Sequence, residues 1–215
     1  MAAAAPHSGD WLLALPVTSC GLRLTDEAVR VAVALRLGCS VCVAHTCRCG
    51  ALVDARGIHG SVSSKIARHQ AINDVIARAI TAAGVPVTEE PVGLARLDGK
   101  LPDGLTLMPW QGGKPLTWDV TVVSTLDSYL HSTSHSAGSA AETASIRKET
   151  KYSYLPPDFV FQPVAIETLG PLNASALNFL SEVGRRLTSL SGDSRETSCV
   201  CSSASQCSYS DSTLL

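Results

Sequence analysis

Acidic residues in the centre of the chain have the types and spacing of a metal site. Asp103 follows a proline, and Asp119 stands inside the apolar run of residues 116–123. A charge inside such a strand is costly unless it is paired or bound to a metal. Glu90 lies on a further expected strand, and carboxylate oxygens suit Mg²⁺. We therefore expect Asp103, Asp119 and Glu90 to be candidate Mg²⁺ ligands. The alternatives are a turn role for Asp103 and a structural salt bridge for Asp119.

A β-hairpin would bring the two aspartates onto neighbouring strands. The pair Gly112-Gly113 separates the apolar runs 104–109 and 116–123. A Gly-Gly pair between two apolar runs is typical of a hairpin turn. Asp103 would then lie where the first strand begins, and Asp119 in the middle of the second. The two carboxylates converge if the register places both on the same side of the sheet.

Two lysines lie on the helix that is expected after this hairpin, over residues 140–154. Lys148 and Lys151 are three positions apart and therefore share one face of that helix. A lysine beside a phosphate group stabilises the negative charge that develops on the phosphoryl oxygens. Carboxylates that hold a metal ion, together with such a lysine, form the set of groups that phosphodiester hydrolysis needs.

Hydrophobic periodicity and turn signals predict an α/β fold. The expected order is helix 25–37, helix 65–83, strands 85–97, 104–109 and 116–123, helix 140–154, strand 159–166 and a last helix capped by Asn173. This order predicts a mixed central sheet flanked by helices. We expect three regions: an N-terminal arm (1–64), the α/β domain (65–190) and a disordered tail (191–215) whose composition is rich in Ser and Cys.

Cysteines are concentrated in the N-terminal arm. Five of the eight cysteines lie in the first 49 residues, and the other three lie in the last 17. Cys39 and Cys42 form a C-x₂-C pair, which can bind one zinc ion from a single turn. Cys49 and His59 are the favoured further ligands, with Cys47 as the alternative to Cys49. The competing interpretation is a group of free cysteines that are simply buried.

The composition limits the classes of function. The 215 residues carry a formal net charge of −2, whereas a dedicated nucleic-acid binder usually carries a basic surplus. Any contact with nucleic acid must therefore come from local basic clusters. No stretch reaches the ~18 consecutive apolar residues of a membrane helix, so we expect no membrane partner.

The order of these residues resembles a known family. Asp103 ends the run Lys-Leu-Pro-Asp, Asp119 follows after 15 residues, and the pattern Lys148-x-x-Lys151-Tyr lies downstream. With Glu90, they resemble the PD-(D/E)xK nuclease core. More closely, they resemble the restriction-like endonuclease region at the C-terminus of non-LTR retrotransposon reverse-transcriptase polyproteins. The residues that extend this match upstream are Arg68-His69 and Asn73, and the resemblance covers about residues 11–190.

The resemblance implies an endonuclease that uses Mg²⁺ or Mn²⁺ to nick DNA in the nucleus. The nick would prime a reverse transcriptase, for which this chain carries no motif, acting on element RNA. Asp103 and Asp119 would bind the catalytic metal, with Glu90 as a further ligand, and Lys148 or Lys151 would be the catalytic lysine. The arm would hold structural Zn²⁺.

One departure from the family pattern is informative. Thr121 stands where the family usually has its lysine, two residues after the second acid, so the lysine must come from the following helix. The alternative reading is a catalytically inactive fragment of a retroelement. Such a fragment would act at most as a zinc- and nucleic-acid-binding module.

Metal analysis tests the zinc site in the N-terminal arm. The purified chain should contain about one zinc ion, because four thiolate and imidazole donors complete a tetrahedral site. Cys42→Ser should remove that zinc, whereas Cys207→Ser in the tail should not. A folded protein without zinc, measured by atomic emission and circular dichroism, would refute the site.

Overall fold

The computed structural model describes residues 26–37, 39–46, 50, 52–55, 62–95, 98–123, 138–167, 171–195 and 200–204. Within this part of the chain, a four-stranded sheet and three long helices form the main domain, and a shorter helix and a two-stranded sheet form a separate arm. None of the described helices has both the length and the apolar content needed to cross a bilayer.

The central sheet has the strand order β3-β4-β5-β6. Its strands are β3 (Val87–Glu89), β4 (Gly104–Thr106), β5 (Leu116–Val123) and β6 (Val160–Glu167). The pairs β3–β4 and β4–β5 are antiparallel, whereas β5 and β6 run parallel. The predicted α/β fold with a mixed sheet flanked by helices is therefore confirmed. The predicted hairpin between the second and third strands of this sheet is also present.

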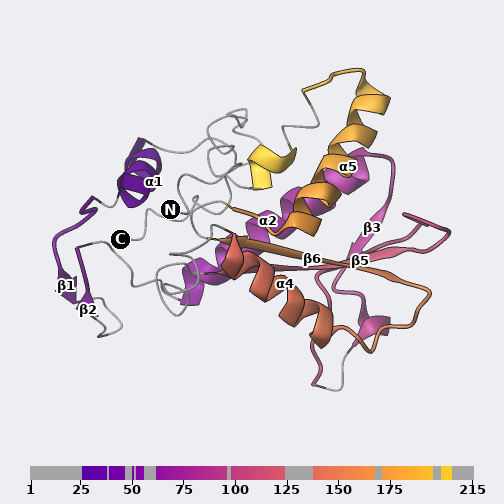
Figure 1. Cartoon of the computed structure of the whole chain (residues 1–215), viewed down its shortest axis with the longest axis horizontal. Coiled ribbons are helices and arrows are strands. Elements are labelled where there is room, and N and C mark those ends of the chain that lie inside the picture. Colours follow the sequence, from indigo (N-terminus) through magenta and orange to yellow (C-terminus); the bar gives the residue numbers. More distant parts are fainter. Residues whose placement is uncertain are drawn as a thin grey trace.

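Helices cover both faces of the sheet. Figure 1 shows α4 (Ser139–Lys151) on one face, with α2 (Val62–Ala82) and α5 (Ala174–Ser191) on the other. Alternate residues of a strand point to opposite faces, and β5 follows this rule. Trp118 and Val120 belong to the large core with α2 and α5, whereas Val123 packs with the alanines of α4. Neighbouring positions of one strand therefore serve two different layers.

Helix α2 is fixed against β5 by apolar packing and one buried polar contact. Ile72, Ile76 and Ile80 recur at helical spacing and are fully buried in the large core. Asn73 lies on the same helix, and its side-chain oxygen accepts a 2.8 Å hydrogen bond from the indole N–H of Trp118. Both groups are buried, so losing either partner would leave the other unsatisfied. This contact sets the position of α2 along β5.

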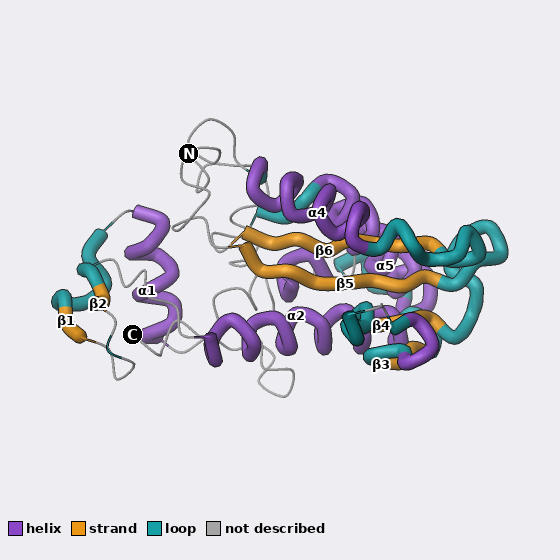
Figure 2. Tube along the Cα trace, turned by 90° about the horizontal axis from the view of Figure 1, so that it is seen from below, coloured by secondary structure: helices purple, strands orange, loops and turns teal. Residues whose placement is uncertain are grey.

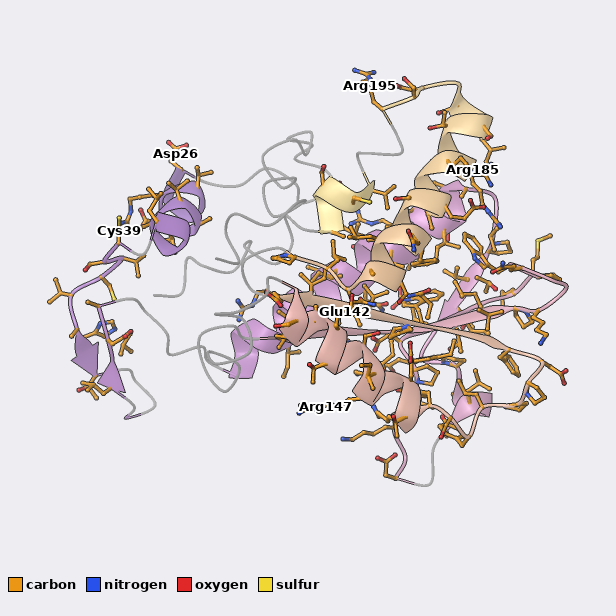
Figure 3. The ribbon with its side chains drawn as sticks, in the orientation of Figure 1. Asp26, Cys39, Glu142, Arg147, Arg185 and Arg195 are labelled. Atoms are coloured by element: carbon orange, nitrogen blue, oxygen red, sulfur yellow. The ribbon has the colours of Figure 1, made fainter. Side chains whose placement is uncertain are left out.

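Helix α4 is held at its N-terminal end by two acidic side chains. Glu167, at the end of β6, accepts hydrogen bonds from the backbone N–H groups of Ala140 (3.0 Å) and Ala141 (3.3 Å). A carboxylate in this position satisfies free N–H groups and complements the helix dipole. Glu142 on α4, labelled in Figure 3, accepts a hydrogen bond from the N–H of Ala174 at the start of α5. The last turn of α4, which carries both lysines, is positioned by these anchors.

Asn173 precedes α5, as the sequence predicts, but its side chain makes no capping hydrogen bond to that helix. Its oxygen instead accepts a hydrogen bond from the backbone N–H of Ala165 at 2.9 Å, and its amide nitrogen donates to Ser145 at 3.2 Å. Asn173 therefore joins β6 to α4. It does so from a fully buried position.

The N-terminal arm and part of the tail are described as well. The arm comprises α1 (Asp26–Leu37) and the antiparallel strands β1 (His45–Thr46) and β2 (Leu52–Val53). Figure 2 shows these elements at one end of the molecule, apart from the sheet. Residues 200–204, within the segment expected to be disordered, form a helical turn, and Val200, Cys201 and Ala204 join the large core. That part of the tail is packed.

Replacement of Gly104 by alanine should destabilise the domain. A Cβ atom at Gly104 would lie 2.0 Å from Cζ2 of Trp118, and relief of such a clash in a packed core costs about 1–3 kcal/mol or more. Urea unfolding followed by circular dichroism measures the change. Gly93→Ala is the matched control, because a Cβ there meets nothing within 4 Å. Equal stability of the two variants would contradict the packing of Trp118 over Gly104.

Candidate active site

The strand register brings Asp103 and Asp119 together. Gly104 pairs with Trp118 across β4 and β5, so the preceding position, Asp103, lies opposite the following one, Asp119. The N–H of Asp103 donates to the carbonyl of Trp118 at 2.9 Å. The Oδ2 atom of Asp103 accepts a hydrogen bond from the N–H of Val120 at 2.5 Å. The carboxylate of Asp103 is therefore fixed against the backbone that carries Asp119.

Three donors from the end of α4 surround the carboxylate of Asp119. Its side chain is 3% exposed. Lys148 Nζ donates to one carboxylate oxygen and the hydroxyl of Tyr152 to the other, while Lys151 Nζ lies 3.7 Å from that second oxygen. A buried carboxylate without partners would be strongly unfavourable. The two lysines and the tyrosine therefore compensate for the burial of Asp119.

Tyr152 connects this group to the segment before β4. Burial raises the pKa of the Tyr152 hydroxyl, and its hydrogen bond to Asp119 raises that pKa further, so the phenol stays neutral and can donate. Its oxygen lies 3.0 Å from the carbonyl oxygen of Leu101 and accepts a 3.3 Å hydrogen bond from Lys151. Its ring packs against Phe161 of β6, with centroids 4.6 Å apart. The phenol is thus held by both the core and the polar network.

His69 reaches the same carboxylates from α2. Its Nε2 atom lies 3.0 Å from Oδ2 of Asp103, with side-chain exposures of 35% for His69 and 15% for Asp103. The hydrogen bond to Asp103 raises the pKa of His69 above its ordinary value, and partial burial opposes that rise. The charge of Asp119 also raises this pKa, whereas that of Lys148 lowers it. His69 is therefore electrostatically coupled to both acids.

The ligand atoms of His69, Asp103 and Asp119 all lie within 4.8 Å of one another. Two carboxylates and one imidazole are suitable donors for a divalent metal ion. The sequence includes His69 in the family pattern but does not indicate it as a metal ligand. The approach of α2 to β4 depends on tertiary packing, which no local pattern reveals.

Glu90 does not join this cluster. It follows the last residue of β3 and has a positive φ of 45°, and its side chain is exposed. Its backbone N–H donates to the carbonyl of Asp103 at 3.1 Å, so only its main chain is tied to the site. The chain turns at Glu90, and the carboxyl group faces solvent. The structure therefore does not bring Glu90 into the expected ligand set.

The two lysines proposed from the sequence both reach Asp119, and they differ in how closely they do so. Lys148 makes a direct hydrogen bond and is 19% exposed, whereas Lys151 is 25% exposed and more distant. Lys151 also lies over the ring of Tyr152, 4.7 Å from its centroid. Of the two, Lys148 is therefore the closer partner of the central carboxylate.

The proposed zinc ligands are described only in part. Cys39 is exposed, and Cys42 is half-buried with its thiol donating to the carbonyl of Asp54 at 3.3 Å. Cys49 and His59 lie outside the described residues. Figure 3 shows Cys39 on the N-terminal arm, well separated from Glu142 and Arg147 on α4. The arm and the carboxylate cluster are therefore separate places in the molecule.

No family model matches the chain, and no curated protein matches it. The interpretation of the site therefore depends on its geometry and on the order of its residues. The geometry joins two acids, a histidine, two lysines and a tyrosine from three different parts of the chain.

The stability of the metal-free protein should depend on pH through His69. The folded-state pKa of His69 lies above the ordinary value of 6.5. Its contribution to the free energy of unfolding is therefore fully present below about pH 6.5 and is lost as pH rises through the raised pKa. The effect should be below about 1 kcal/mol, because the side chain is partly solvated. Urea unfolding in EDTA between pH 5.5 and 8.5 measures it. His69→Gln should remove this component, and an unchanged pH profile would contradict it.

Proposed function

We propose that this protein is a metal-dependent DNA endonuclease of the PD-(D/E)xK type. The observation that carries the proposal is the convergence of Asp103 and Asp119 with Lys148 from α4. A carboxylate on β5, a second one directly before the paired strand β4, and a lysine directed at the first are groups that suit phosphodiester hydrolysis. The resemblance of the ordered residues to retrotransposon endonucleases supports the same reaction class.

The roles of the residues follow from their positions. Asp103 and Asp119 would hold Mg²⁺ or Mn²⁺, since hydrogen bonds from the β5 backbone and from α4 already orient their oxygens. When bound, such an ion polarises the scissile phosphate and lowers the pKa of its bound water. Lys148 would stabilise negative charge on the phosphoryl oxygens. Tyr152 and Lys151 would keep the second oxygen of Asp119 in place.

The lysine position supports this assignment despite the change at Thr121. Thr121 is two residues after Asp119 on β5 and is half-buried, so it points to the same face of the sheet. Helix α4 packs on that face and carries Lys148 to the carboxylate. A lysine from the following helix therefore supplies the charge that Thr121 cannot.

The partners proposed with this activity are DNA, element RNA and a reverse transcriptase domain, with the nucleus as the location. Zinc in the N-terminal arm would provide a separate element for nucleic-acid binding. These proposals derive from the family resemblance and add partners and a location to the activity proposed for the carboxylate site.

One observation favours a second function, in which the chain is an inactive fragment that binds zinc or nucleic acid. Lys148 and Tyr152 already occupy both oxygens of Asp119. The same group could therefore serve as a buried structural ion pair that joins β5 to α4, without any metal. A nicking assay separates this alternative from the endonuclease.

Supercoiled plasmid should be nicked by the full chain with Mg²⁺ or Mn²⁺ and left intact in EDTA. Asp103→Asn and Asp119→Asn should each lower the nicking rate by at least about 100-fold, and Lys148→Met by about the same factor, because loss of one charge-stabilising group costs on that order. The rate of open-circle formation on agarose gels is the measurement.

Two exposed substitutions serve as controls. Asp74→Asn on α2 and Glu149→Gln on α4 change exposed acids and should leave the rate unchanged. Thermal melts followed by circular dichroism establish that each variant is folded. Absence of nicking by the wild-type chain, or nicking that persists in both aspartate variants, would reject the endonuclease and favour the inactive fragment.

A further inference from the structure

We propose that His69 is a third ligand of the metal held by Asp103 and Asp119, and that this mixed donor set favours Mn²⁺ over Mg²⁺. The inference deepens the proposed function, because it rests on the same carboxylates. It changes the expected ligand set, in which Glu90 was the third donor, and it replaces an oxygen ligand by an imidazole nitrogen.

The geometry allows the three side chains to share one ion. Bonds of about 2.0–2.2 Å from a divalent ion to nitrogen or oxygen place two ligand atoms at most roughly 4.4 Å apart. The ligand atoms of His69, Asp103 and Asp119 are all within 4.8 Å of one another without any ion. The three ligand atoms would therefore need to move by less than about 1 Å to reach one shared ion.

The position of His69 is set by rigid structure. His69 and Asn73 are one helical turn apart on α2, and Asn73 is bonded to the buried indole of Trp118. Trp118 is the residue before Asp119 on β5. The helix and strand that carry the nitrogen and the second carboxylate are therefore joined directly beside the site. Such support keeps a ligand oriented before the metal arrives.

The charges around the carboxylates make the nitrogen important. Lys148 and Lys151 both face Asp119. The two positive charges of these lysines offset the two negative charges of Asp103 and Asp119. A cation is therefore attracted only weakly by net charge, and its affinity depends on the coordinate bonds themselves. Imidazole binds transition metals well, whereas Mg²⁺ demands oxygen ligands and retains its water. The third ligand thus favours a first-row transition ion.

Coordination changes the contact between His69 and Asp103. Nε2 now lies 3.0 Å from Oδ2 of Asp103. A bound ion would take the lone pair of Nε2, so a proton that this nitrogen shares with Asp103 would be released to solvent. His69 would then be a neutral ligand, and Asp103 would offer the ion a carboxylate that the Val120 N–H still orients.

Manganese binding to the full chain tests the inference without any DNA. Titration with Mn²⁺, followed by the electron paramagnetic resonance signal of the free ion, gives its affinity, and displacement by Mg²⁺ gives the preference between the two ions. His69→Ala should weaken Mn²⁺ binding by about tenfold or more, because even the loss of an outer hydrogen-bond partner costs about 10–100-fold. Affinity for Mg²⁺ should change by less than about threefold, since this ion depends on oxygen donors.

The matched control is His45→Ala, which removes an exposed histidine from the N-terminal arm and should leave Mn²⁺ affinity unchanged. Pulsed electron paramagnetic resonance of the wild-type chain detects nitrogen bound to Mn²⁺ directly, without a variant. Coupling of the bound Mn²⁺ to a ¹⁴N nucleus is expected, and loss of this coupling in His69→Gln would assign it to His69. Absence of the coupling, or equal Mn²⁺ affinity in wild type and His69→Ala, would overturn the inference.

The outcome is separable from that of the nicking assay. If Mn²⁺ binds through His69 and plasmid is not nicked, the metal site stands and the endonuclease fails. If plasmid is nicked and Mn²⁺ affinity does not depend on His69, the endonuclease stands and the third ligand is wrong.

Discussion

The structure depends on a carboxylate that is buried in an inner strand of its sheet. Asp119 is 2% exposed, and a charge in that position is stable only with partners close by. Breaking one side of such a buried pair costs about 3–5 kcal/mol. Helix α4 supplies the partners, which explains why its last turn must lie over β5. Two acids, Glu167 and Glu142, anchor the other end of α4. They thereby fix the position of the helix along its axis, so that Lys148 lies beside Asp119. The charge of Asp119 and the two acidic anchors therefore position α4 together.

Much of this fold could be predicted from the sequence, because its elements are marked by local signals. The isoleucines of α2, the Gly-Gly turn and the apolar run of β5 each specify an element through its own periodicity. The pairing of Asp103 with Asp119 could not be predicted, because a hairpin loop of this length is compatible with several registers. Trp118 settles the register by packing over Gly104, and that contact is invisible in a linear pattern. Glu90 was expected at the site for its type and strand, but the backbone turns at that residue.

His69 shows what the sequence does not reveal. The sequence places a histidine on an expected helix, but it does not show which residue that histidine contacts, since the distance between α2 and the start of β4 is a property of three-dimensional packing. The same helix turn that carries His69 carries Asn73, whose contact with Trp118 is buried. The site is thus supported by the core beneath it. In this arrangement, apolar packing fixes the elements that carry the polar side chains, so the cluster keeps its geometry.

The alternation of Trp118 and Asp119 along β5 has a consequence for how this protein can err. A shift of the strand by one residue would turn the indole of Trp118 towards α4 and the carboxylate of Asp119 into the apolar layer under α2. Each misplacement is unfavourable by itself, and the two occur together. A misregistered molecule would therefore lose its core and separate Asp119 from its partners, so any molecule that passes as folded also holds Asp103 and Asp119 side by side. Quality control that recognises only exposed apolar surface would, in this protein, also select for molecules in which the two aspartates are paired.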